Sequence, residues 1–124
     1  MNSKRPVNLD ISTIQLPLSA LTSITHRISG VILFAGIAVL LWIFDTSLSG
    51  PQGFEQVSQT MQGPFARFII WGILSALAYH MVAGVKHLLL DAGIGESREG
   101  GPQVARAVVV VSVILIALLG VWIW

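Results

Sequence analysis

Three long apolar stretches constrain this chain more than any other feature of its sequence. They run over about residues 28–48, 65–90 and 107–124. A transmembrane helix needs about 20 predominantly apolar residues, so each stretch is long enough to cross a bilayer. Charged residues make up 10% of the chain, against roughly 25% in typical soluble domains. The sequence therefore predicts an all-α integral membrane protein with three transmembrane helices.

The polar segments between these stretches are short. Residues 49–64 and 92–104 are rich in glycine, proline and polar side chains, a composition typical of loops. There is no internal repeat and no linker to a second domain. We therefore expect a single transmembrane anchor domain over residues 1–124.

The distribution of basic residues predicts the orientation in the membrane. Residues 1–27 should form an N-terminal segment ending in an interfacial helix, which begins near Leu18 because Pro17 suits a first helical turn. Since cytoplasmic segments carry an excess of Lys and Arg, the N-terminus and the 92–104 segment should be cytoplasmic, and the 49–64 segment and the C-terminus outside. Only Arg67 borders the 49–64 segment, whereas six basic residues lie on the other side: Lys4, Arg5, Arg27, Lys86, Arg98 and Arg106.

Composition also limits the chemistry. The net charge of +1 gives no support to a nucleic-acid partner. The chain has no cysteine, which excludes disulfides and thiolate ligands for iron–sulfur clusters or zinc. Any metal held by this chain must therefore use histidine or carboxylate ligands.

The second span carries a polar stripe. His80, Gly84, His87 and Asp91 are separated by 4, 3 and 4 residues, so they share one helical face. By helical rise, His80 lies roughly 15 Å below the cytoplasmic boundary. Charge is unfavourable at that depth, so the neutral imidazole is expected, and a neutral imidazole with a free ring nitrogen is what heme iron binds.

The rest of this stripe suits a flat ligand or a neighbouring helix. Gly72 and Ala76 lie close to the same face, where small side chains permit close approach. His87 lies where the carboxylates of a heme held by His80 could emerge, and Asp91 can accept a hydrogen bond from His87. The alternative is that His80 only forms a hydrogen bond to another helix. A second histidine ligand, if the iron takes two, must come from another polypeptide.

The start of the first span carries a second polar group. Ser23, His26, Arg27 and Gly30 are spaced as one helical face at the headgroup boundary. A hydroxyl and a guanidinium there are suitable hydrogen-bond donors for a quinone carbonyl that becomes negative on reduction. His26 could deliver protons or bind an anionic group. The alternative is that Arg27 contacts lipid phosphate and Ser23 caps or bonds to the helix backbone.

These residues make the sequence resemble a known family, the cytochrome b membrane-anchor subunits of bacterial succinate dehydrogenase, a succinate:quinone oxidoreductase. The resemblance covers essentially the whole chain. The two most specific elements are S-x-x-H-R-x-S-G and H-x-x-x-G-x-[RK]-H-x-x-x-D, each on its expected helix. The matching segments are RPVNLD at residues 5–10, SITHRISG at 23–30, GFEQ at 53–56, WGIL with LAYH at 71–80, and HMVAGVKHLLLD at 80–91.

The resemblance implies roles for individual residues. His80 would be an axial ligand of heme b and so the ligand of the heme iron, with the second axial ligand supplied by a second hydrophobic anchor subunit. His26, Arg27 and His87 would lie near the heme propionates. Ser23 and Arg27 would form part of the ubiquinone site. No residue of this chain would be catalytic in succinate oxidation.

The resemblance also implies partners and a location. An iron–sulfur subunit and a flavoprotein subunit would pass electrons from succinate to ubiquinone, and the two anchor subunits would form a heme-containing helix bundle. The complex would lie in the bacterial inner membrane, in contact with lipid, with the C-terminus periplasmic. Lys86 departs from the family pattern, where many relatives carry arginine, and lysine lacks the bidentate geometry of arginine.

Two other functions remain open at this point. The chain could be the anchor of a fumarate reductase or of another quinone-linked enzyme. It could also be a membrane docking module without a cofactor, whose polar residues only stabilise contacts between helices.

Overall fold

The computed structural model describes residues 18–94 and 100–124, which are almost entirely helical. Three of its helices are long and apolar enough to cross a membrane. The prediction of an all-α protein with three membrane-spanning helices is confirmed. In the described part of the chain the elements are α1 (Leu18–Leu48), α2 (Pro51–Met61), α3 (Pro64–Asp91) and α4 (Gly100–Ile123).

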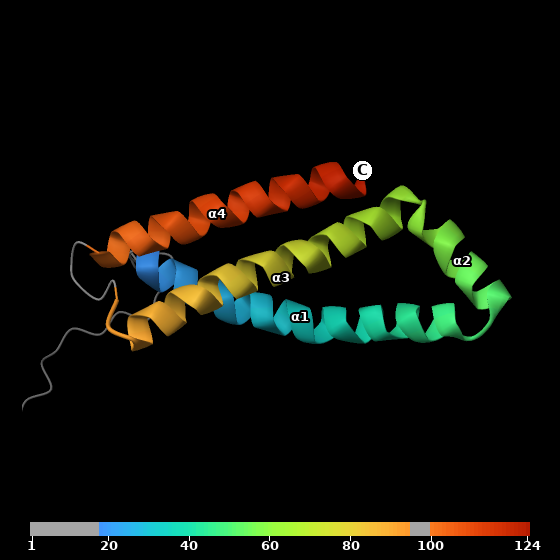
Figure 1. Ribbon diagram of the computed structural model, residues 1–124, viewed down its shortest axis with the longest axis horizontal. Helices are drawn as coiled ribbons and strands as arrows, with labels where there is room; N and C mark the ends of the chain where they lie inside the picture. The colour runs from blue at the N-terminus through green and yellow to red at the C-terminus, as the bar shows by residue number, and fades with distance from the viewer. Residues whose placement is uncertain (1–17, 95–99) are drawn as a thin grey trace, which may run out of the picture.

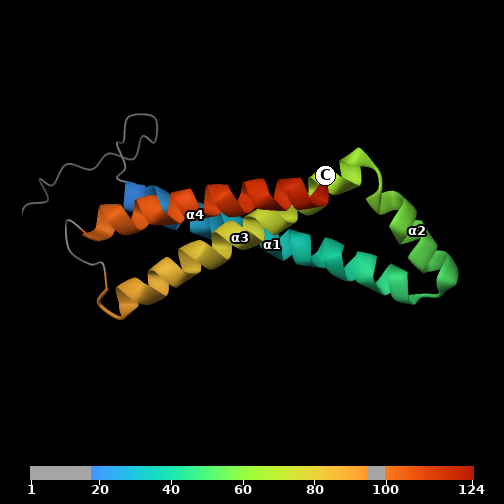
Figure 2. The same cartoon turned by 45° about the horizontal axis from the view of Figure 1, so that its top comes forward.

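The long helices run side by side along the length of the molecule, and α2 joins the far ends of α1 and α3 (Figure 1). Helix α3 contacts both α1 and α4, and α1 also contacts α4. In the turned view, α1 again begins beside the start of α4 and diverges from it toward α2 (Figure 2). We call the end where α1 and α4 begin and α3 ends the basic end, and the opposite end the α2 end. Arg27, Lys86 and Arg106 belong to the basic end.

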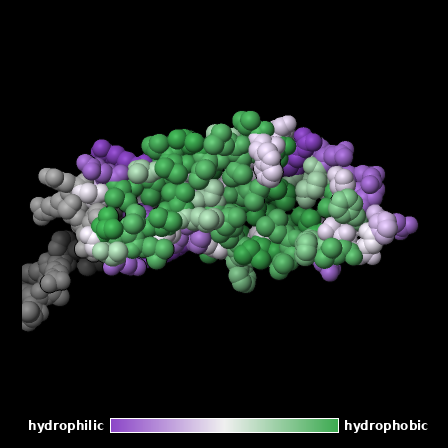
Figure 3. Space-filling model, viewed as in Figure 1, coloured by the Kyte–Doolittle hydropathy of each residue, from purple (hydrophilic) through white to green (hydrophobic). Residues whose placement is uncertain are grey.

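Most large apolar side chains point outward. Phe34 is 84% exposed and Val121 is 80% exposed. Hydrophobic residues cover the visible face of the long helices, whereas hydrophilic residues gather toward the two ends (Figure 3). Lipid tails are as apolar as leucine, so this exposure carries no penalty in a bilayer. The buried apolar side chains of the described residues are Leu33, Ile73, Ala83, Ala105 and Val108.

One stripe on α1 packs against α3, and we call this contact the α1–α3 seam. The stripe repeats at intervals of four and three residues, the spacing that keeps one helical face toward a partner. Its contacts with α3 differ along its length, because polar side chains meet near the basic end and apolar ones near the α2 end. The stripe consists of Thr22, His26, Ser29, Leu33 and Gly36.

The expectation of a loop over residues 49–64 is wrong, because most of this segment forms α2. Glycine and proline are typical of turns, but Pro51 lies in the first turn of α2, where its fixed φ and missing N–H are tolerated. Phe54, Val57 and Met61 follow at intervals of three and four, the period of an amphipathic helix. Helix α2 is therefore an amphipathic element that lies across the ends of two spans.

The other boundaries differ less from the expectation. A helix does begin at Leu18, but it continues without interruption to Leu48, so no separate interfacial helix precedes the first span in the described residues. Helix α4 begins at Gly100, seven residues before the expected start at 107, and this shortens the 92–104 loop. Helix α4, like α2, has a proline in its first turns, where proline is tolerated. Because glycine and proline are also typical of loops, the composition of this segment predicts a loop instead. Residues 1–17, including Pro17, lie outside the described residues.

Candidate functional site

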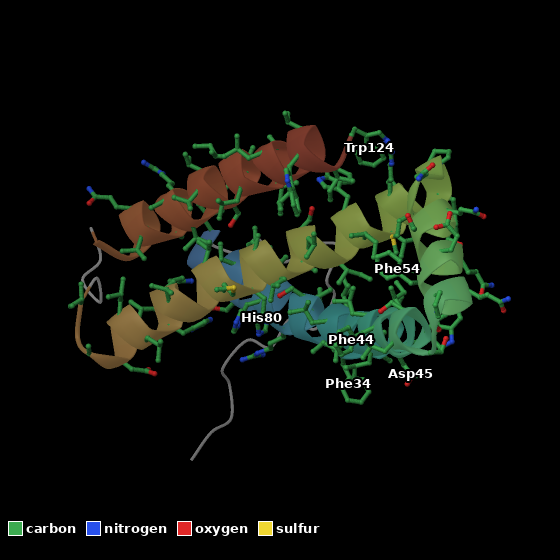
Figure 4. All side chains as sticks on the ribbon, turned by 45° about the vertical axis from the view of Figure 1, so that its right-hand side comes forward. Phe34, Phe44, Asp45, Phe54, His80 and Trp124 are labelled. Carbon is green, nitrogen blue, oxygen red and sulfur yellow. The ribbon has the colours of Figure 1, made fainter. Side chains whose placement is uncertain are left out.

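Three histidines from two helices form a row along the α1–α3 seam. His80 lies where α3 crosses α1 (Figure 4). The His26 ring from α1 stacks on the His80 ring, with centroids 4.2 Å apart and planes at 20°. The His87 ring, also from α3, lies with its centroid 4.9 Å from that of His26 and its plane tilted by 41°. Residues 54 and 61 positions apart in sequence are thus brought together by the packing of α1 on α3.

One ring nitrogen of His80 is engaged with α1. Its Nδ1 atom lies 3.0 Å from the Ser29 hydroxyl oxygen and 3.2 Å from the His26 carbonyl oxygen. The Ser29 hydroxyl itself donates to the same carbonyl over 2.6 Å. Within the described residues, the Nε2 atom of His80 makes no hydrogen bond. The cross-helix hydrogen bond therefore occupies one nitrogen and leaves the other for a ligand, so the two roles weighed for this histidine are compatible.

Glycines determine how closely the rings approach the two helices. A Cβ atom on Gly30 would lie 3.1 Å from Cε1 of His80, and one on Gly84 would lie 3.7 Å from Nε2 of His26. Gly84 thus faces the His26 ring, where the sequence suggested space for a flat ligand. A Cβ atom on Gly72, by contrast, would have no described neighbour within 4 Å. The small-residue face of α3 is therefore filled by α1 near the basic end and open farther along.

A buried polar network lies beside the histidine row, and sequence reasoning missed most of it. Lys86 is 3% exposed, and its Nζ atom donates to the Thr22 hydroxyl over 2.6 Å. Tyr79 donates its hydroxyl proton to the Thr22 carbonyl over 2.8 Å and also meets the Thr25 hydroxyl. A charged residue within a span normally faces the bundle interior, and that rule applied to Lys86 could have found the network.

The residues expected at a quinone site lie on the flank of α1. Ser23 is half-buried, and Arg27, one turn later, is exposed. Within the described residues, the exposed Arg27 guanidinium makes no hydrogen bond or ion pair. His26, expected on the same face, turns instead toward His80. Asp91 is exposed at the end of α3, and its expected hydrogen bond with His87 is not formed.

The α2 end contains a cavity of a different character. It has a volume of about 430 Å³ and is lined by residues of α1, α2 and α3. Its lining is mostly apolar, with Trp42 and Phe65 among the large side chains and Thr46, Gln56 and Thr60 as the polar ones. The described residues that line it include no titratable side chain, so they offer no proton carrier.

The geometry of the histidine row suits a single axial ligand. The rings of His26 and His80 present their faces to one another, so their nitrogen lone pairs do not converge on one point. Within residues 18–94 and 100–124, no group of three His, Cys, Asp or Glu side chains is arranged to hold a metal ion. A metal bound through His80 would have to bring most of its ligands with it, as the iron of a porphyrin does.

Comparison with known proteins agrees with the transmembrane, all-α fold. Residues 1–119 match the family described as succinate dehydrogenase/fumarate reductase transmembrane subunit. The chain is 39% identical to the succinate dehydrogenase cytochrome b556 subunit of Coxiella burnetii, over the full length of both proteins. It is 34% identical to the cytochrome b556 subunit of Paracoccus denitrificans, over 92% of this chain and 88% of that protein.

A mitochondrial relative extends the likeness beyond bacteria. The succinate dehydrogenase cytochrome b560 subunit of Sus scrofa is 31% identical, over 94% of this chain and 68% of that protein. The residues matched by the family include the whole histidine row and nearly all of the three spans. The chain therefore belongs to the succinate dehydrogenase/fumarate reductase transmembrane subunit family.

Proposed function

We propose that this chain is the heme b-binding membrane-anchor subunit of a succinate dehydrogenase and contributes to the site where ubiquinone is reduced. The observation that carries the proposal is the Nε2 atom of His80, which no other described group engages. The relatives named above are cytochrome b subunits of succinate dehydrogenases, which favours this function over that of a fumarate reductase anchor.

The residues present fit a heme. His80 is half-buried on the seam, with one nitrogen fixed to α1 and the other available to iron. Heme b supplies a one-electron carrier that alternates between ferrous and ferric iron. His26 stacks on His80 with its ring face and so does not offer a second axial nitrogen. We therefore assign the second axial ligand to a second hydrophobic anchor subunit.

Three side chains at the basic end suit the carboxylates of the heme. His26 and His87 lie in the same row as His80, and Arg27 lies one residue beyond His26. A carboxylate near the headgroup region is stabilised by a guanidinium and by imidazole N–H donors. We propose that these three residues form the propionate region and that Lys86, held against Thr22, acts there through its charge rather than by direct contact.

The quinone residues are Ser23 and Arg27. They lie one turn apart on the flank of α1, near the start of the span, and Arg27 is exposed with its donors available to a bound molecule. A quinone oxygen gains negative charge as electrons arrive, so a hydroxyl and a guanidinium stabilise the reduced forms more than the oxidised one. In this proposal the two residues orient the quinone headgroup and bind it through hydrogen bonds.

Succinate oxidation belongs to other chains. This chain has no cysteine for iron–sulfur clusters, so an iron–sulfur subunit and a flavoprotein subunit supply those centres. They would dock on the basic end, whose excess of Lys and Arg supports a cytoplasmic position in a bacterium. The anchor would then lie as one unit in the inner membrane with its C-terminus on the periplasmic side.

An absorption spectrum of the purified complex tests the heme assignment. The reduced-minus-oxidised difference spectrum of the wild type should contain a b-type band, and His80→Leu should abolish or strongly alter it because the axial nitrogen is lost. His87→Leu separates iron ligation from the propionate contact: it removes a histidine of the same row but no iron ligand, so the band should persist while the heme is held less tightly. A wild-type complex without heme, or a normal band in His80→Leu, would refute the assignment and favour a docking module without a cofactor.

Enzyme kinetics test the quinone assignment separately. Arg27→Ala should impair ubiquinone reduction while succinate oxidation by a soluble artificial acceptor continues, because only the quinone site is changed. Arg106→Ala is the control, since Arg106 is an exposed arginine at the same end but on α4. Equal loss of both activities in an assembled Arg27→Ala complex would show that Arg27 does not belong to the quinone site.

A further inference from the structure

We propose that Ser29 is a positioning residue for the heme iron: with the His26 carbonyl, it holds the proton of His80 on Nδ1 and so directs the Nε2 lone pair outward as the ligand. The proposal rests on the heme-binding function given above. It assigns a role to a buried residue, 5% exposed, that no part of that function has used so far.

The first step concerns the tautomer of His80. A backbone carbonyl oxygen has no hydrogen and can only accept. The His26 carbonyl lies 3.2 Å from Nδ1, within hydrogen-bond distance, so Nδ1 must carry the proton for this contact to be favourable. In a neutral imidazole the other nitrogen, Nε2, then bears the lone pair.

The second step concerns the direction of the Ser29 hydroxyl. Its single proton is donated to the His26 carbonyl over 2.6 Å. The hydroxyl oxygen, 3.0 Å from Nδ1, is therefore left as an acceptor for the same Nδ1 proton. Ser29 and the His26 carbonyl thus form two acceptors on one side of the ring. A ring flipped by 180° about χ2 would turn Nδ1 away from both of them and lose these contacts.

The third step concerns the space for this arrangement. Gly30 follows Ser29, and a Cβ atom there would lie 3.1 Å from Cε1 of His80, closer than an ordinary contact. The absence of a side chain at residue 30 lets the ring approach α1 closely enough for both hydrogen bonds. Ser29 therefore supplies a hydrogen-bond acceptor, and Gly30 leaves the space that the His80 ring occupies.

The consequence for the iron follows from ligand chemistry. Acceptors on the distal N–H of a ligating histidine fix its orientation and raise its basicity. A more basic imidazole donates more strongly to ferric than to ferrous iron, so it stabilises the oxidised heme. The Ser29 hydroxyl should therefore lower the reduction potential of the heme and slow its loss from the complex.

Redox titration of the b-type band in the purified complex is the test. Ser29→Ala should retain heme but shift its midpoint potential upward, and its heme should be lost about 10-fold more readily in detergent, as is usual when such a partner is removed. Ser29→Thr, which keeps a hydroxyl, should restore the wild-type potential. Ser112→Ala is the matched control, because Ser112 is also a buried serine but its hydroxyl has no hydrogen-bond partner among the described residues.

The outcomes separate this proposal from the function on which it rests. A wild-type complex without heme would refute the function, whereas a heme-bearing Ser29→Ala complex with unchanged potential would overturn only the role of Ser29. If Ser29→Ala fails to assemble, Ser29→Cys decides, because a thiol is a weaker hydrogen-bond acceptor than a hydroxyl. An upward shift of the midpoint potential in Ser29→Cys would support the proposal, and an unchanged potential would overturn it.

Discussion

The two halves of the α1–α3 seam are built from the same helices but hold together by different means. Toward the basic end, Lys86 meets Thr22 and His80 meets Ser29, and each of these contacts is a hydrogen bond between polar side chains. Toward the α2 end, Gly36 lies under Ile73 and the contact is apolar. Beyond it the helices separate around the 430 Å³ cavity.

This difference indicates which half was shaped by function. In a bilayer, apolar contacts between helices gain only close packing, because lipid is an equally apolar neighbour. Buried ionisable groups are costly there and are retained where they serve a site. The apolar half therefore holds the two helices together. The polar half positions His80 and its neighbours, although burying its ionisable groups is unfavourable.

Matched glycine substitutions should give the largest contrast between the two halves. Gly30→Val would press against His80, so the ring must leave its hydrogen bonds and the b-type band should be lost or strongly changed. Gly36→Val would press against Ile73 and should cost about 1–3 kcal/mol of stability through overpacking, with the band intact. Difference spectra and unfolding in detergent measure the two effects. Equal spectral change in both variants would contradict the division of the seam.

Substitutions at the buried lysine should give an intermediate effect. Thr22→Val removes an acceptor that Lys86 uses and leaves its ammonium group in place, which should cost about 1.5–3 kcal/mol, the range for a hydrogen bond to a charged group. Lys86→Met removes the cation, so no buried charge is left without that acceptor. It should therefore lower the free energy of unfolding by less than Thr22→Val does. Unfolding of the two variants under identical detergent conditions compares them. The reverse order would mean that the charge itself, rather than its solvation, stabilises the seam.

The smallest effect should come from the contact between α3 and α4. Trp71 donates its indole N–H to the Ile116 carbonyl over 3.0 Å, at the α2 end and away from the histidines. Trp71→Phe should cost about 0.6 kcal/mol, the average for a hydrogen bond between membrane helices. Heme spectrum and quinone reduction should stay at wild-type levels. A change in either would show that the α2 end influences the histidine row.

The sequence predicts most of the fold because a bilayer imposes a simple rule. Spans are found from length and apolar composition, and all three were found in this way. Helix α2 is not predicted, because Gly50 and Pro51 are typical turn residues and the helical period of Phe54, Val57 and Met61 is short. A short amphipathic helix depends on its position at the membrane surface, which composition alone does not reveal.

The candidate site was only partly predictable for a related reason. Helical spacing placed His80 and His87 on one face of α3, and their row in the structure agrees with that spacing. Spacing within one helix cannot tell which face of α1 meets them. The stacking of His26 on His80 and the partnership of Lys86 with Thr22 depend on the rotation of α1 about its axis, which only the packed structure supplies.

Helix α2 also has a consequence for how deeply the whole bundle lies in the membrane. Its sequence places Glu55 and several glutamines on a short helix that also exposes Phe54. Displacement in one direction along the membrane normal would carry the carboxylate of Glu55 into hydrocarbon, and displacement in the other would carry the phenyl ring of Phe54 into water. Both movements are unfavourable, so Glu55 and Phe54 help to fix the depth of His80 in the membrane although they lie at the other end of the spans.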